Sequence, residues 1–257
     1  MNIVVTVKQT FDTEAKIVLD GKGSIDGSGV NLVINPYDEF AIEEALKLKE
    51  KFGGDVTVVS VGGERVTEAI RTALAMGCDK AVRIDDPALA NADEWAVAEI
   101  LAKAVSKLPC DIILSGRIAV DDGSSQVAVR LADALGVPSV SSILKLDIEG
   151  DAATVTREID GGTELIEVKL PAVFTAQKGL NEPRLPSMKG IMGAKKKEIA
   201  VLSLADVGVG AGDVTAKMGV PKFSLPSPRK GGKVIPGEAP DAARELAKLL
   251  REEAKVI

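Results

Sequence analysis

The residues best suited to ligand chemistry lie in the stretch GRIAVDDGSSQV, from Gly116 to Val127. This stretch leaves a predicted apolar strand over 111–115 and leads into a helix predicted to start near Ser124 or Ser125. Backbone amides and the positive end of the dipole make a helix N-terminus attractive to anions, and small residues let a phosphate approach the backbone. A capped helix after a D-D-G turn would have the same sequence, so the loop alone does not establish a phosphate site.

Three other segments are expected to border the same crevice. Thr6 to Lys8 follow the first predicted strand, Ser60 to Gly63 follow the second, and Asn35 to Asp38 begin the first predicted helix. Ligands of α/β sheets bind outside the carboxyl ends of the strands, where such loops meet. The two common phosphate-loop motifs, G-x-G-x-x-G and G-x-x-x-x-G-K-[ST], do not occur in the sequence. The convergence of several loops nevertheless predicts a nucleotide site.

Residue types that are missing from the sequence narrow the chemistry. The chain has no histidine, and its two cysteines, Cys78 and Cys110, lie far apart with no second ligand spaced near either one. The sequence therefore offers no zinc pattern, no disulfide framework and no imidazole base for hydrolysis. A formal net charge of −6 and an aromatic share of 3% argue against a nucleic-acid partner. We expect a carrier or binding role with no catalytic residue and no metal.

The elements that would position these loops alternate between β and α. Continuous apolar runs predict buried strands, and the amphipathic stripes between them predict helices, which together indicate a parallel sheet covered on both faces. In the first helix, Asn35 is expected to cap the amides ahead of it, with Pro36 at the first position and Asp38 completing a box-like start. The predicted strands cover 3–7, 56–61, 81–84 and 111–115, and the predicted helices cover 35–53, 64–76, 93–108 and 124–136.

After Pro138 the pattern changes to strict alternation. Apolar and polar residues alternate over 143–148, 153–159 and 165–170, separated by EGDA and DGG turns, as they do in antiparallel hairpins. The predicted fold is therefore α/β: a doubly wound, mostly parallel, Rossmann-like sheet of the adenine-nucleotide-binding type, with an antiparallel hairpin addition.

The tail of the chain has few residues to bury. It contains a Pro/Lys/Gly-rich stretch from Pro221 to Pro240, followed by a last amphipathic helix. We divide the chain into a nucleotide-binding α/β domain, 1–200, which includes the loop at 180–197, and an extended C-terminal arm, 201–257. The arm would either pack on another subunit or remain solvated.

One segment looks unlike any part of a globular core. Residues 170–197 read LPAVFTAQKGLNEPRLPSMKGIMGAKKK and contain three prolines, so we expect an irregular loop. The loop is nevertheless apolar, which indicates that it meets a partner. The segment closely resembles the signature of the electron transfer flavoprotein β subunit, whose LNEPR block appears at 180–184 and whose closing IM-x-AKKK appears at 191–197.

This resemblance, strong over 1–197 and loose over the tail, implies an AMP site in the predicted crevice. The residues that match the family's AMP-binding regions are Thr6, Asn35, Pro36, Tyr37, Asp38, Val61, Gly116, Ala119, Val120, Asp121, Asp122, Gly123, Ser124, Ser125, Gln126 and Val127. Many members read D-D-D-x-N-Q-T where this chain reads DDGSSQV, so a carboxylate and a hydroxyl are lost. That loss would suit a more phosphate-rich ligand, and electron-bifurcating relatives hold a second FAD in place of AMP. AMP remains the first expectation.

In this family the loop at 180–197 docks on acyl-CoA dehydrogenases and other flavin dehydrogenases by inserting an apolar side chain. The usual leucine aligns with Met188, and methionine is unbranched enough to fill pockets of different shape. The resemblance assigns partner docking to Leu180, Asn181, Glu182, Pro183, Arg184, Leu185, Met188, Ile191 and Met192. Alternatively, the apolar residues only anchor the loop, and Lys195, Lys196 and Lys197 form a solvated run.

The resemblance further implies a heterodimer whose α subunit holds most of the redox FAD. Single electrons would pass from dehydrogenases, as in fatty acid β-oxidation, to a membrane quinone oxidoreductase. We expect a bacterial or archaeal cytoplasmic protein rather than a mitochondrial one, with no direct membrane insertion, because the start MNIVVTV lacks the features of a signal. An alternative from another class is an ATP-binding or adenylate-hydrolysing enzyme on the same fold, although the chain has KQTFDTE where that class has a Gly/Ser-rich phosphate loop.

Overall fold

The computed structural model describes residues 1–219, 222–229 and 231–257 and divides the chain into two compact units. Unit 1 comprises Met1–Val18 and Ile25–Pro221, and unit 2 comprises Leu19–Ser24 and Lys222–Ile257. Pro221 and Lys230, which belong to the predicted Pro/Lys/Gly-rich stretch, lie outside the described residues. Each unit is described by itself.

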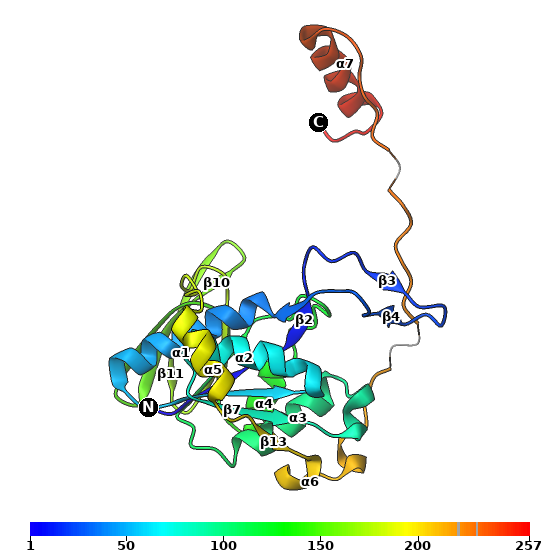
Figure 1. Ribbon diagram of the computed structural model, residues 1–257. Coiled ribbons are helices and arrows are strands. Elements are labelled where there is room, and N and C mark those ends of the chain that lie inside the picture. The colour runs from blue at the N-terminus through cyan, green and yellow to red at the C-terminus, as the bar shows by residue number, and fades with distance from the viewer. Residues whose placement is uncertain (220–221, 230) are drawn as a thin grey trace. The chain divides into compact units, whose positions relative to one another are not determined.

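Unit 1 is built on a nine-stranded sheet with the order β11-β10-β9-β12-β8-β1-β6-β7-β13 (Figure 1). In this spatial order, all neighbouring strands from β9 across to β13 at the far edge are parallel. At the other edge, β10 pairs antiparallel with both β9 and β11. The strands are β1 (Ile3–Thr6), β6 (Val56–Val61), β7 (Lys80–Ile84), β8 (Ile112–Gly116), β9 (Ser139–Glu149), β10 (Ala152–Ile159), β11 (Gly162–Lys169), β12 (Val173–Ala176) and β13 (Ala200–Leu202). The predicted mostly parallel sheet with its antiparallel hairpin is confirmed.

Helices cover both faces of the parallel part of this sheet (Figure 1). One face, whose core includes Ile3, Val5 and Phe174, is covered by α1 (Pro36–Phe52), α2 (Thr67–Met76) and α5 (Met188–Lys196). The opposite face, whose core includes Val4 and Ile113, is covered by α3 (Glu94–Val105), α4 (Val127–Leu135) and α6 (Leu204–Val207). Strands buried on both faces explain why the sequence shows continuous apolar runs rather than alternation.

Short elements complete the fold. The 3₁₀ helices are η1 (Glu64–Val66), η2 (Pro87–Asn91) and η3 (Ala211–Val214). Two further pairs of strands form small sheets, β2 (Gln9–Phe11) with β5 (Leu32–Ile34), and β3 (Val18–Leu19) with β4 (Ile25–Asp26). The helix predicted over 64–76 is thus η1 followed by α2, because its first turn is a tighter 3₁₀ turn.

Two sequence predictions were wrong in detail. The stretch 170–197 was expected to be irregular, but it contains the strand β12, which is fully buried between β8 and β9, and the helix α5. Pro171 precedes this strand rather than interrupting it, so it removes no hydrogen bond from the ladder. The fourth helix starts at Val127 rather than at Ser124 or Ser125, because Ser125 has a φ of 54° and therefore cannot begin a right-handed helix.

The C-terminal part of unit 1 extends past the predicted boundary at residue 200. That boundary falls inside β13, and Leu204, Val207, Val209 and Val214 are buried in the core beside α3. In unit 2, α7 (Ala239–Glu252) begins close to the predicted start, with Pro240 in its first turn. The structure describes α7 in full, and none of its residues is buried; Leu246 is 47% exposed.

A matched pair of substitutions tests how α5 packs on α2. A Cβ at Gly190 would collide with the carbonyl oxygen of Ala75, whereas no described heavy atom lies within 4 Å of a Cβ at Gly193. Gly190→Ala should lower the free energy of unfolding by about 1–3 kcal/mol through overpacking. Gly193→Ala should raise it by about 0.5–1 kcal/mol, because alanine loses less backbone entropy in a helix. Urea unfolding of both variants checks this, and equal effects would contradict the close contact.

Candidate functional site

The candidate nucleotide site lies where the order of the strands reverses. From β1 the chain passes outward through β6 and β7, and it then returns to place β8 on the other side of β1. The loops that follow β1 and β8 therefore leave the sheet side by side at its carboxyl edge, where α/β sheets bind ligands. This edge is where the sequence predicts the nucleotide site.

Two buried side chains at the start of α1 tie these loops together. Asp38 is 4% exposed and accepts hydrogen bonds from the backbone amides of Lys8, at 2.7 Å, and Gly116, at 3.1 Å. Asn35 is 1% exposed; its amide nitrogen donates to Asp38 Oδ1 and to the carbonyl of Ile118, and its oxygen accepts from the amide of Val120. One polar pair therefore joins the loop after β1, the loop after β8 and the first turn of α1.

The predicted capping role of these residues was wrong. In the described helix, Asn35 makes no side-chain bond to the amides of α1, and Pro36 occupies the first turn, where it has no amide to satisfy. The Asn35 side chain is instead used by the loop after β8. Capping statistics favour asparagine at this position, but they do not tell whether a distant loop will compete for the same atoms.

Gly116 makes this arrangement sterically possible. A Cβ there would collide with Asp38 Oδ1 and would lie 2.8 Å from the Tyr37 carbonyl carbon. The carboxyl end of β8 can therefore approach the start of α1 this closely only with glycine. Tyr37 packs against the next residue of the loop, since the guanidinium carbon of Arg117 lies 5.7 Å from the centre of its ring.

Lys8, which lies in the loop after β1, binds two aspartates in the loop after β8. Its Nζ forms ion pairs with Asp121 at 2.8 Å and Asp122 at 2.7 Å. Burial lowers the pKa of Lys8, but the hydrogen bonds and charges of the two aspartates outweigh it, and the pKa is raised overall. The sequence placed Lys8 at the rim of the crevice without naming it as a ligand-binding residue, because nothing in the sequence connects it to acids more than a hundred positions away.

The other predicted site residues lie on β1, at the end of β6 and in the segment from β8 to the start of α4. Thr6 is 6% exposed and lies on β1 opposite Val59 and Ser115 of its neighbours. Val61 ends the adjacent strand β6 and packs against the core on the α3 side. The remaining predicted residues lie in the loop before α4, which turns at Gly123 with a φ of 67°, and at the first position of α4. They are Ala119, Val120, Gly123, Ser124, Ser125 and Gln126 in the loop and Val127 in the helix.

Gln126 is the exception among these loop residues. Its side-chain oxygen accepts hydrogen bonds from Arg130 Nε at 3.0 Å and Nη2 at 2.8 Å. The Gln126 side chain is therefore bonded to the first turn of α4. In the loop itself, Asp122 accepts a hydrogen bond from the backbone amide of Ser124 at 2.8 Å. The loop is held by its own bonds as well as by Lys8.

The predicted docking segment is anchored at its beginning. Leu180 is buried in the core of unit 1, and Asn181 and Arg184 bond back to α1. The side chains that follow are exposed, at 90% for Leu185 and 76% for Met188. Of the other predicted docking residues, Pro183 is half-buried, Glu182 is exposed, and Met192 and Ile191 are 64% and 39% exposed.

The docking segment is also anchored at its end. Arg71 of α2 donates from Nη1 to the carbonyls of Ala194 and Lys197, and Lys197 Nζ donates to the carbonyl of Cys78. The alternative expectation of three solvated lysines at 195–197 therefore does not hold for Lys197, because its side chain and its carbonyl are both hydrogen-bonded to other parts of the chain. The exposed apolar side chains sit between two fixed ends.

The remaining polar and sulfur groups do not extend this site. Burial raises the pKa of Cys78 to about 12 and that of Cys110 to about 11, so both stay protonated thiols. Within the ranges that the structure describes, no cluster of three histidine, cysteine or acidic residues is placed to hold a metal. No helix in those ranges is long and apolar enough to cross a membrane.

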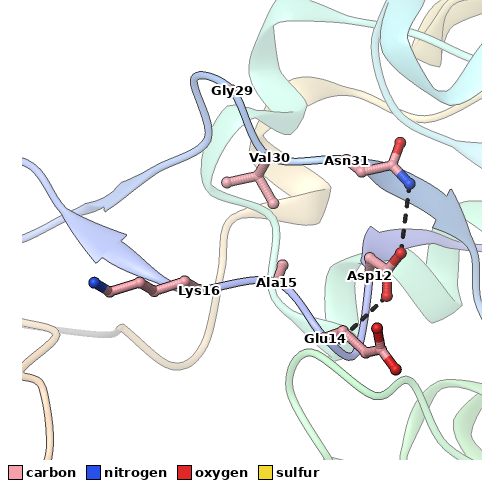
Figure 2. A pocket seen from close by; sticks show the side chains of 7 residues that line it. All are labelled: Asp12, Glu14, Ala15, Lys16, Gly29, Val30 and Asn31. Atoms are coloured by element: carbon pink, nitrogen blue, oxygen red, sulfur yellow. Dashed lines mark hydrogen bonds between the residues drawn. The ribbon is translucent and has the colours of Figure 1, made fainter.

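An open hollow lies apart from the residues described above. It is lined by Asp12, Glu14, Ala15, Lys16, Gly29, Val30 and Asn31 (Figure 2). Figure 2 shows the Asp12 carboxylate accepting from the Asn31 amide at 3.4 Å and from the Glu14 backbone at 3.0 Å. The hollow is lined by both polar and apolar residues, and none of the predicted site residues belongs to it.

The buried Asp38 predicts a pH dependence of stability. Burial raises its pKa to about 7, against the hydrogen bonds from Asn35, Lys8 and Gly116. Because this pKa is higher in the folded chain than the value of about 4 in the unfolded chain, Asp38 costs stability as the pH rises from about 4 to about 7. Asp38→Asn should be less stable throughout, since an amide N–H must face a backbone donor, but its deficit should shrink across that window.

The measurement is urea unfolding of both proteins at several pH values between 4 and 8. The difference in free energy should change by up to about 1.4 kcal/mol per pH unit. Asp160→Asn, at an exposed turn, controls for the loss of one charge. A deficit that stays constant with pH would refute the raised pKa.

Comparison with known proteins assigns the family. Residues 22–207 match the model of the electron transfer flavoprotein domain. A Bacillus subtilis (strain 168) protein named electron transfer flavoprotein subunit beta is 47% identical over 258 residues, covering 100% of both chains. Proteins with the same name from Syntrophomonas wolfei and Bradyrhizobium diazoefficiens are 47% and 41% identical, covering 100% of this chain and 98% and 100% of their own. The chain therefore belongs to the electron transfer flavoprotein family, and within it to the β subunits.

Proposed function

We propose that this chain pairs with an α subunit and carries single electrons from acyl-CoA and other flavin dehydrogenases to a membrane quinone oxidoreductase. The redox FAD is held mainly by the α subunit, and this chain contributes no catalytic residue. The observation that carries the proposal is the docking segment, whose exposed Leu185 and Met188 lie between two anchored ends. Large apolar side chains kept in water at fixed positions are typical of a binding surface.

We assign AMP to the carboxyl edge of the sheet, where the loops after β1 and β8 leave it. Lys8 supplies a cation, and the small residues before α4 leave space, since no described heavy atom lies within 4 Å of a Cβ at Gly123. These groups would hold the phosphate, together with the loop at 121–127. Thr6, Val61 and residues 35–38 would hold the adenosine. When bound, AMP serves as a structural ligand and takes no part in electron transfer.

We assign the C-terminal arm to the α subunit. The exposed stripe of α7 contains Leu246 together with the half-buried Leu249 and Leu250. An amphipathic helix gains most of its stability by packing this stripe against another surface. Packing on the α subunit would bury this stripe of α7. We place the heterodimer in the bacterial cytoplasm, in keeping with its bacterial relatives.

Ligand extraction tests the nucleotide assignment. Denaturing the purified heterodimer should release equal amounts of FAD and AMP. Lys8→Met should retain FAD but lose AMP by about tenfold or more in affinity, because Asp121 and Asp122 are then unpaired beside the phosphate. Release of two FADs per heterodimer would instead support electron bifurcation. ATP turnover by this chain alone would overturn the carrier function.

Substitution of Met188 tests the docking assignment. Met188→Ala should weaken binding to an acyl-CoA dehydrogenase, because a buried anchor commonly carries ~2 kcal/mol or more of interface energy. The readout is the KM for the dehydrogenase in flavin reduction, with the flavin content unchanged. Met218→Ala removes an equally exposed methionine, 66% exposed, outside the segment and should leave the KM unaltered. Identical kinetics for the two variants would remove the assigned role.

A further inference from the structure

Helix α1 buries two carboxylates that the nucleotide site does not use. Glu43 and Glu44 are 6% and 4% exposed, although the helix packs on the sheet through apolar residues such as Ala41 and Ile42. A buried carboxylate is costly unless it is paired, so a glutamate at such a position requires a partner. Each of the two has a partner at the start of the docking segment, more than 130 residues later in the chain.

Arg184 pairs with Glu43 through a planar fork. Its Nε lies 2.8 Å from Glu43 Oε2, its Nη2 lies 2.9 Å from Oε1, and its backbone amide donates to Oε2 at 3.0 Å. Its remaining Nη1 lies 2.6 Å from Glu50, whose side chain is 61% exposed. Hydrogen bonds to Glu43, and then to Glu50, raise the pKa of Arg184 above its ordinary value. Bidentate pairing fixes the direction of a guanidinium as well as its position.

Asn181 makes a second connection to the same helix. Its side-chain nitrogen donates to Glu44 Oε2 at 2.9 Å and to the Phe40 carbonyl at 3.0 Å. Glu44 is neutralised in turn by Lys47, one turn along α1, at 3.1 Å. The beginning of the docking segment is thus fixed at two points, three residues apart.

These bonds matter because residues 181–187, all described, form neither helix nor strand. The segment has no ladder of its own, so side-chain bonds to α1 must determine its path. Helix α1 is a suitable base, since Ala41, Ile42 and Ala45 are fully buried against the sheet. The exposed Leu185 directly follows Arg184, and Met188, three residues later, is the first residue of α5.

We propose that Glu43 and Glu44 are positioning residues for partner docking, holding Asn181 and Arg184 so that Leu185 and Met188 are presented to the dehydrogenase in one geometry. This inference rests on the proposed docking function of the segment. Both glutamates are buried, so their proposed action is through Asn181 and Arg184. Their contribution is to spare the complex the cost of ordering the segment when it binds.

The test compares Glu43→Gln with Glu50→Gln in the FAD-containing heterodimer. Glu43→Gln replaces one acceptor of the fork by an amide donor in a buried place, whereas Glu50→Gln alters an exposed pair that contributes little. We expect Glu43→Gln to speed amide hydrogen exchange over 181–187 and to raise the KM for an acyl-CoA dehydrogenase by about tenfold. Glu50→Gln should change both by less than about twofold. Flavin content and reduction by dithionite should be unaltered in both variants.

Two results would overturn the inference: unchanged exchange over 181–187, or faster exchange with an unchanged KM. Measuring Met188→Ala alongside distinguishes a failure of the positioning role from a failure of the docking function. If Met188→Ala raises the KM and Glu43→Gln does not, only the positioning role fails; if neither raises it, the docking function fails. Should Glu43→Gln not fold, Arg184→Lys replaces it, because lysine keeps the charge at a partly exposed site but cannot form the fork. A normal KM in that variant would also count against the inference.

Discussion

A single buried carboxylate, Asp38, holds the carboxyl edge of the sheet together. It joins the amides of Lys8 and Gly116, which follow or end the two strands between which the strand order reverses. Burial penalises its charge, and three N–H donors offset a part of that cost, so that the pKa of Asp38 stays raised. A buried carboxylate of this kind fixes the position of the loops that donate to it. The backbone at Gly116 comes so close to Asp38 that a Cβ there would collide with its Oδ1. The crevice assigned to AMP has its shape because of this arrangement.

Helix α1 connects the two proposed sites. Its first turn carries Asn35 and Asp38, which shape the nucleotide crevice, and its later turns carry Glu43 and Glu44, which hold the docking segment. All four side chains are buried, and all four bond to segments distant in sequence. The helix therefore acts as a shared base whose apolar stripe fixes it on the sheet and whose buried polar groups fix the loops around it.

This arrangement suits the electron-carrier role that we propose. In a flavoprotein the cofactor carries the redox chemistry, so under this proposal the chain supplies geometry: a rigid body, a partner surface and a stable contact with the α subunit. An exposed apolar segment is costly in water and tends to collapse or aggregate. Anchoring it through Arg184 at one end and through Arg71 at the other keeps Met188 exposed and available.

The sequence by itself determined the strands β1 and β6–β11, the helices α1–α4 and α7, and the family, because apolar periodicity and the LNEPR and AKKK blocks are local signals. It did not indicate β12, β13 or α5. It also predicted a ligand site at the carboxyl edge of the sheet, since loops after parallel strands meet there. Only the tertiary structure decided which polar atoms pair: Asn35 bonds to the loop after β8 rather than to its own helix, and Arg184 reaches Glu43 across 141 positions. Hydrogen bonds are short-ranged, so their partners exist only once folding has brought distant segments together.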